Sequence, residues 1–105
     1  MLRLPITTSP DWLHNAHAGE LLWSEFMEPL GLSAGDLALA LRLSADRIQA
    51  VIDGERRVDG EIDLRLARYF KMSEGFFLRL QDSYELLEAK RALNGDLDHI
   101  VPRAA

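Results

Sequence analysis

The sequence predicts an all-α protein built from five short helices. Apolar side chains recur three and four residues apart from Ala18 to Leu87, a spacing that gives a helix one buried face. Serine and aspartate stand where the helices are expected to begin, and glycine or asparagine where they end, as helix capping requires. No segment shows the strict alternation of apolar and polar residues that is typical of a half-buried strand. A chain of 105 residues has the length of one domain.

The N-terminal segment, residues 1–17, is expected to be an arm rather than a helix. Two prolines and the polar run Thr7-Thr8-Ser9 interrupt any helical pattern there. The first helix is expected to begin near Ala18 and to end at residues 29–31, where a proline and a glycine stand. Its apolar face comprises Leu22, Phe26 and Leu30.

Two short helices joined by a tight turn occupy the centre of the sequence. Ser33 is the predicted N-cap of a helix at 34–42, and Ser44 is the predicted N-cap of a helix at 44–53. Ala38 is small at the point where these two helices must cross closely. A larger side chain there would push the helices apart.

Two further helices complete the predicted domain. The fourth is expected to begin near Asp59, and the fifth at an N-cap formed by Ser73. An Asn-Gly pair at 94 and 95 ends the fifth helix. Residues 18–93 therefore form the predicted helical domain, and residues 94–105 a flexible tail.

Composition and charge limit the classes of protein and partner. The chain has 12 Lys and Arg against 17 Asp and Glu, a net charge of −5. That balance argues against a protein that coats nucleic acid without sequence preference, although a local basic face can still bind DNA. The absence of cysteine suits a reducing cytoplasm. Residues 1–5 lack the apolar run of a secretory signal, and no apolar stretch is long enough for a bilayer, so we expect a cytoplasmic protein without membrane contacts.

The two central helices have the size and spacing of a helix-turn-helix, whose second helix enters the major groove of DNA. Arg47 suits bidentate hydrogen bonding to guanine, and Gln49 to adenine. Ser33 and Ser44 cap helix N-termini, where free backbone N–H groups can hold a phosphate. Short amphipathic helix pairs also occur in bundles that bind no DNA, so periodicity alone leaves this interpretation open. The residues expected to face the base edges are Ser44, Ala45, Asp46, Arg47 and Gln49.

Several longer motifs support the helix-turn-helix interpretation. The run Ala18-Gly19-Glu20-Leu21-Leu22, preceded by His17, is similar to the opening His-Pro-Gly-Glu-Ile-Leu of the HigA-type antitoxins. The run Asp53-Gly54-Glu55-Arg56-Arg57 resembles the Asn-Gly-Lys-Arg loop of that family. Residues 64–70 and 76–81 resemble its leucine-arginine-leucine-alanine helix and the aromatic segment that follows. The combination covers about residues 17–90 and is specific, whereas no single motif is.

The resemblance implies a five-helix fold of the XRE or lambda-repressor type, a homodimer, repression of its own operon, and a cognate RelE/HigB-like toxin that cleaves mRNA. It also implies that Ala45, Asp46, Arg47 and Gln49 read bases and that Arg56 and Arg57 contact phosphates. Several positions depart from the family pattern, among them Ala34, which stands where a phosphate-binding glutamine is frequent, and Asp53, which stands where the loop asparagine is usual. Arg42 stands where a turn glycine is usual, and Glu55 where a loop lysine is usual. Since residues 42–58 carry four arginines and three carboxylates, we expect weak non-specific affinity for DNA.

An apolar stripe on the fifth helix predicts a homodimer interface. The stripe continues beyond what the core of a small domain needs, and an uncovered apolar face is unfavourable in water. Two copies pairing about a two-fold axis would cover it and would place two recognition helices about 34 Å apart. The alternative is that the stripe packs wholly onto the first and fourth helices. Its residues are Phe77, Leu80, Tyr84 and Leu87.

No other cluster of residues predicts a chemical activity. His14 and His17 lie three apart, but no third ligand is near them, so we expect an exposed pair rather than a metal site. Trp12 and Trp23 are expected to pack. No nucleophile–base set, paired carboxylate or phosphate-binding loop is evident, so we expect no enzyme and no cofactor. Three functions remain: a DNA-binding antitoxin and autorepressor, a stand-alone regulator, and a toxin-neutralising module that has lost DNA binding.

Overall fold

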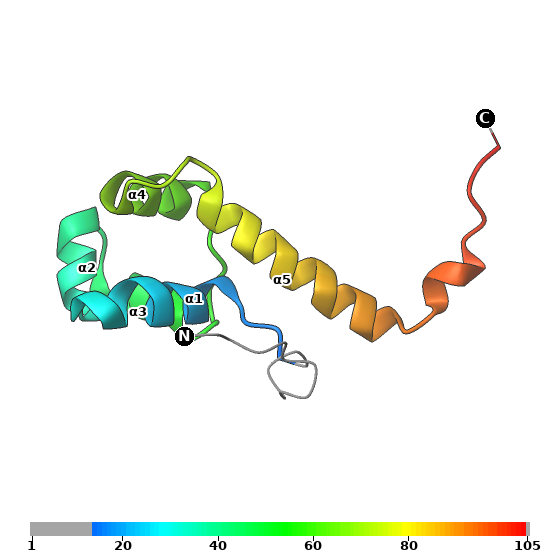
Figure 1. Ribbon diagram of the computed structural model, residues 1–105, viewed down its shortest axis with the longest axis horizontal. Helices are drawn as coiled ribbons and strands as arrows, with labels where there is room; N and C mark the ends of the chain where they lie inside the picture. The colour runs from blue at the N-terminus through cyan, green and yellow to red at the C-terminus, as the bar shows by residue number, and fades with distance from the viewer. Residues whose placement is uncertain (1–13, 105) are drawn as a thin grey trace, which may run out of the picture.

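The computed structural model describes residues 14–104, and within them the regular elements are all helical (Figure 1). The all-α prediction is therefore confirmed. Residues 14–17, the described end of the predicted arm, are not helical. The elements in chain order are α1 (Ala18–Leu21), η2 (Leu22–Met27), η3 (Glu28–Leu30), α2 (Ala34–Leu41), α3 (Ala45–Ile52), α4 (Gly60–Phe70), α5 (Phe76–Leu93) and η4 (Asp96–His99).

The first predicted helix is not a single regular α-helix. One α-helical turn is followed by the π-helix η2 and by the 3₁₀ turn η3, which contains Pro29. The π-helix hydrogen bond pattern, from residue i to i+5, lets Leu22 and Met27 share a face, and both are fully buried. Gly31 adopts φ +68° directly after η3 and ends the segment where the sequence predicted its end.

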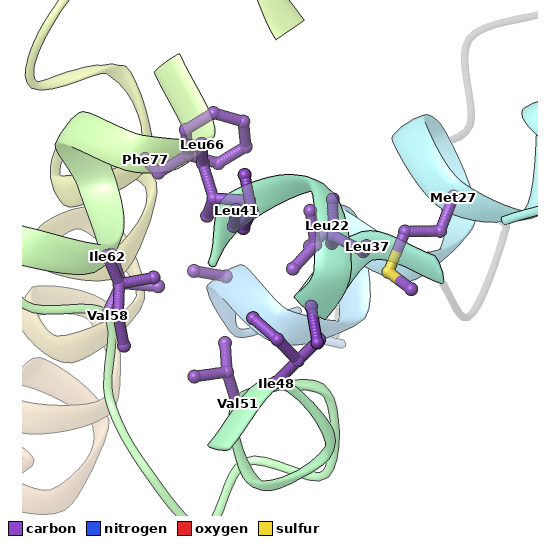
Figure 2. Packing of buried hydrophobic residues seen from close by; sticks show 12 residues of the cluster. Leu22, Met27, Leu37, Leu41, Ile48, Val51, Val58, Ile62, Leu66 and Phe77 are labelled. Atoms are coloured by element: carbon purple, nitrogen blue, oxygen red, sulfur yellow. The ribbon is translucent and has the colours of Figure 1, made fainter. Parts of the chain in front are cut away.

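Side chains from α2, α3, α4 and α5 point toward one another and toward Leu22 in a single core (Figure 2). Ala38 is buried on α2, which packs against α3, as the close crossing of these helices predicts. A second close approach was not predicted from the sequence. A Cβ added to Gly19 would lie 1.8 Å from the carbonyl oxygen of Val51, so only glycine allows α1 to cross the end of α3.

The predicted Ser73 cap of α5 is wrong. The N-cap is Gly75, which has no side chain to offer, and the carboxylate of Asp63 on α4 takes over the capping role. This buried carboxylate accepts hydrogen bonds from the backbone N–H groups of Gly75, Phe77 and Leu78 at 2.6, 2.8 and 3.0 Å. A negative charge at a helix N-terminus also interacts favourably with the helix dipole. Asp63 therefore joins α4 to α5.

Helix α5 leads the chain away from the other helices. Figure 1 shows α2 and α4 at one end of the long axis and the C-terminus at the other, in a molecule that measures 50 × 39 × 24 Å. Asn94 adopts φ 44° and ends α5 at the predicted position. Among the described helices, none has both the length and the apolar character that crossing a bilayer demands.

Candidate nucleic-acid interface

The turn between α2 and α3 has helix-turn-helix geometry. Helix α2 ends at Leu41, and Arg42 follows in the left-handed conformation, with φ 62°. The N–H of Leu43 donates to the carbonyl of Ala38 at 2.9 Å. The side chain of Leu43 is half-buried against the core, so it fills the turn. An arginine in this conformation costs about 1–2 kcal/mol relative to the right-handed region.

Both predicted serine caps are present. The hydroxyl of Ser33 accepts from the N–H of Asp36 at 3.0 Å, and the carboxylate of Asp36 accepts from the N–H of Ser33 at 3.1 Å. That backbone hydrogen bond lowers the pKa of Asp36. The hydroxyl of Ser44 accepts from the N–H of Arg47 at 3.2 Å. Since each hydroxyl already serves its own helix, a phosphate would meet the remaining N–H groups of these two N-termini.

The N-terminal half of α3 exposes some of the predicted base-reading residues but not all of them. Ala45, Asp46 and Gln49 are exposed, and the Gln49 amide donates to the carboxylate of Asp53 at 2.9 Å. The side chain of Arg47 instead turns toward the start of α4 and is only 21% exposed.

Arg47 forms an ion pair with two acids of α4. Its Nη2 donates to Glu61 at 2.8 Å and lies 3.7 Å from the carboxylate of Asp59. The hydrogen bond from Arg47 lowers the pKa of Glu61. Asp59 is also the N-cap of α4, where it accepts from the N–H of Ile62 at 2.9 Å, and this backbone hydrogen bond lowers the pKa of Asp59 first, with Arg47 adding to the effect. In the free protein Arg47 therefore contacts α4 and not open solvent.

The two loop arginines are also paired. Arg56 lies 3.5 Å from the carboxylate of Asp59. Arg57 donates twice to Glu85 on α5, at 2.8 and 3.2 Å, and lies 3.7 Å from Asp82. The hydrogen bond from Arg57 lowers the pKa of Glu85. Both arginine side chains remain about half exposed, so a further partner can still reach them.

We call the surface formed by Ser44, Ala45, Asp46, Arg47, Gln49, Arg56 and Arg57 the α3 face. Residues 42–61 carry four arginines and five carboxylates, so the segment as folded has no excess of positive charge. Sequence reasoning found the arginines but missed their partners on α4 and α5, because those partners lie 3 to 28 positions further along the chain. The one available signal was the predicted start of a helix near Asp59.

Comparison with known proteins identifies the family. No family model matches the chain. Virulence-associated protein I of Dichelobacter nodosus is 39% identical over 75 residues, which are 71% of this chain and 69% of the relative. The Pseudomonas aeruginosa antitoxin HigA, solved with its higBA promoter, is 30% identical, with a TM-score of 0.78 over 88% of this chain and 100% of its own. The chain belongs to the HigA-type antitoxin family. An addiction module antidote protein of the HigA family from Coxiella burnetii is likewise 30% identical, with a TM-score of 0.79 over 87% of this chain and 99% of its own.

The family fold predicted from the motifs, five helices of the XRE type, is thus confirmed. The motif residues also explain the local structure of this HigA-type chain. His17, from the opening motif, caps α1: its Nδ1 accepts from the N–H of Glu20 at 3.2 Å, and Glu20 accepts from the N–H of His17 at 3.3 Å. HigA-type antitoxins and related regulators are not enzymes.

The apolar stripe on α5 divides into two parts. Phe77 is 0% exposed, inside the core of its own chain, so its prediction as a dimer contact is wrong. Leu80 packs against the same core, and the ring of Tyr84 stands edge-on to His17 at 5.9 Å. Leu87, at 37%, is exposed, and so are two leucines that the prediction left out, Leu86 and Leu93. The first half of α5 therefore packs within the chain, and the second half offers an uncovered apolar surface.

The remaining predictions concern histidine and tryptophan. His17 is a helix cap and not an exposed residue, whereas His14 is exposed and lies 2.9 Å from Glu20. Within the described part of the chain, no group of three potential ligands could hold a metal ion. Trp23 is exposed, so its predicted packing role is wrong. Trp12 lies outside the described residues.

Proposed function

We propose that this HigA-type chain is a cytoplasmic antitoxin that binds the operator of its own gene as a homodimer, represses it, and neutralises a RelE/HigB-like toxin. The observation that carries the DNA-binding part is the capped helix-turn-helix, together with its similarity to a HigA protein solved on its promoter. In that arrangement α3 enters the major groove. Ala45, Asp46, Arg47 and Gln49 then lie nearest the bases.

DNA binding at the α3 face is then an exchange of partners. Arg47, Arg56 and Arg57 leave carboxylates of their own chain and contact DNA, with Arg47 reading a guanine and the loop arginines holding phosphates. The ion pairs of Arg56 and Arg57 are about half exposed. Surface ion pairs in general contribute only about 0–1 kcal/mol, so phosphates can replace these carboxylate partners. The N-termini of α2 and α3, at Ser33 and Ser44, supply uncharged contacts to phosphate.

A mobility-shift titration tests this part of the proposal. The purified chain should shift a fragment taken from upstream of its own gene at much lower concentration than a scrambled fragment of equal length. Ala45→Glu, which adds a negative charge at an exposed position of α3, should abolish the difference, whereas Ser24→Glu, on the exposed surface of η2, should leave it intact. Equal affinity of the wild type for both fragments would show that the chain lacks specific DNA binding.

The homodimer part rests on the C-terminal half of α5. Leu86→Glu combined with Leu87→Glu should convert a dimer into a monomer in sedimentation equilibrium, because charges replace exposed apolar side chains of this surface. Circular dichroism serves as the control for folding. If the folded double variant sediments as the wild type does, dimerisation uses another surface, such as the N-terminal arm.

The toxin part rests on charge and on family membership. A net charge of −5 suits a basic RNA-cleaving partner. Co-expression with the neighbouring reading frame should give a complex that co-purifies and should relieve growth inhibition by that frame. If the neighbouring frame is neither toxic nor bound, the chain is a stand-alone regulator. The paired arginines favour one further candidate, a toxin-binding module without DNA binding, which the mobility shift separates from both.

A further inference from the structure

A groove of about 760 Å³ lies between the C-terminal ends of α2 and α4 and the turn that follows α4. Its apolar lining includes Leu41, Leu64 and Met72. The groove does not coincide with the α3 face. The proposed DNA contacts lie at the N-terminal ends of α2 and α3, whereas the groove lies at the C-terminal ends of α2 and α4. A partner for it must therefore be sought separately.

The charges of this groove distinguish it from the rest of the molecule. Four cations line it, Arg42, Arg65, Arg68 and Lys71, and Glu74 is its one carboxylate. Arg65 is already paired with Glu61. Within residues 14–104, the other three cations have no carboxylate within ion-pair distance. We call it the cationic groove. In a chain with a net charge of −5, it is suited to a ligand that is both acidic and apolar.

The C-terminal tail of this chain, residues 94–105, has that chemistry. Asp96 and Asp98 supply two negative charges. Three apolar side chains lie between or just after them and are largely exposed: Leu97 at 50%, Ile100 at 67% and Val101 at 84%. Apolar side chains clustered this closely and left uncovered are unfavourable in water. The tail thus needs an apolar surface flanked by positive charge.

In this fold the tail cannot reach the cationic groove of its own chain. Helix α5, 18 residues long, spans about 27 Å at 1.5 Å per residue and carries the tail to the end of the long axis opposite α2 and α4 (Figure 1). A second copy brings a tail to the groove without any change in the fold of either chain. We propose that the cationic groove binds residues 96–101 of a second copy of this chain.

Cysteine cross-linking tests the proposal directly, because the full chain contains no cysteine of its own. A chain carrying Ile100→Cys is mixed with a differently tagged chain carrying Leu64→Cys in the groove. The mixed disulfide should form at least about tenfold faster than with the control Ser24→Cys, which is exposed outside the groove, since docking raises the effective concentration of the pair. Equal rates for both pairs would overturn the proposal.

A charge exchange separates docking from chance collision. Arg68→Glu with Lys71→Glu in the groove chain should reduce the mixed disulfide to the control level. Asp96→Lys with Asp98→Lys in the tail chain should restore it. Arg68→Glu alone, with a smaller loss, keeps the test available if the double variant does not fold. The proposal would be contradicted if neither set of charge substitutions changed the rate of disulfide formation. It would also be contradicted if the groove cysteine were joined to a co-purified toxin and not to the tail.

Discussion

The α3 face and the cationic groove both carry several cations, but the cations of the α3 face are paired and most of those in the groove are not. On the α3 face each of the three arginines has a carboxylate beside it, with Arg47 bonded to Glu61 at 2.8 Å and Arg57 to Glu85 at 2.8 Å. In the groove Arg42, Arg68 and Lys71 have none among the described residues. The number of arginines in a segment therefore says little about how much positive charge is available to a ligand.

Whether the cations are paired determines how each surface would bind a ligand. A ligand at the α3 face must displace carboxylates, so the interaction is weak without the correct bases, in keeping with a protein that selects its site. A ligand at the cationic groove would meet an apolar lining and three cations that have no carboxylate partner among residues 14–104, so its own charge and apolar surface would decide the affinity.

The largest effect is expected from Asp63→Ala, because the Asp63 carboxylate links α4 to the start of α5. Removing this buried carboxylate leaves three backbone N–H groups without an acceptor. We expect the free energy of unfolding to fall by about 3–5 kcal/mol. Urea titration followed by circular dichroism measures it. Asp63→Asn, which keeps one acceptor oxygen, should lie between Asp63→Ala and the wild type, and an unchanged urea midpoint for Asp63→Ala would disprove the capping role.

Arg47→Ala should weaken binding to the operator by about 1–3 kcal/mol and relax the choice of one base. Quantitative mobility shifts at one salt concentration, with the operator varied base by base, measure both effects. The matched control is Arg68→Ala in the groove, which should leave operator affinity unchanged. If Arg68→Ala costs as much as Arg47→Ala, the groove and not the α3 face is the DNA-binding surface.

Glu61→Gln should have a smaller effect, of opposite sign, because it releases Arg47. We expect tighter DNA binding and an increase of up to about one unit in the steepness of log K against log salt. Glu28→Gln, on the exposed surface of η3, is the control. No change in either quantity would show that the ion pair does not restrain Arg47.

The same ion pair should leave a trace in the dependence of stability on pH. Arg47 lowers the pKa of Glu61, so the pair stabilises the folded chain above the pKa of an unfolded glutamate. That contribution is lost as the pH falls through the lower, folded pKa. Glu61→Gln should therefore flatten the acid side of the stability curve, and an identical curve for the variant would contradict the pairing.

Arg42→Gly should have the smallest effect, a gain in the free energy of unfolding of about 0.5–1 kcal/mol. Glycine adopts φ 62° without the steric cost that arginine bears. Lys71→Gly, at φ 60°, is the matched variant on the other side of the groove. Thermal unfolding measures both, and destabilisation by both would show that their side chains, not their backbones, dominate at these positions.

Local chemistry made the helix-turn-helix readable from the sequence. A serine cap involves residues three apart, so Ser33 with Asp36, and Ser44 with Arg47, could be found without knowledge of the fold. The end of α5 at Asn94 depends likewise on its own backbone. The residues of α3 that we propose to face DNA follow from the same local spacing.

The tertiary structure alone decided which of these side chains are available. Phe77 belongs to the apolar pattern of α5, but only packing shows that it is buried. Arg47 finds its partner 14 positions away, and Asp63 caps a helix that begins 13 positions after it. Hydrogen bonds and ion pairs act over a few ångströms of space, whatever the separation along the chain. The helices and the helix-turn-helix therefore follow from local patterns along the chain, whereas the pairing of the arginines and the cationic groove depend on where α4 and α5 lie.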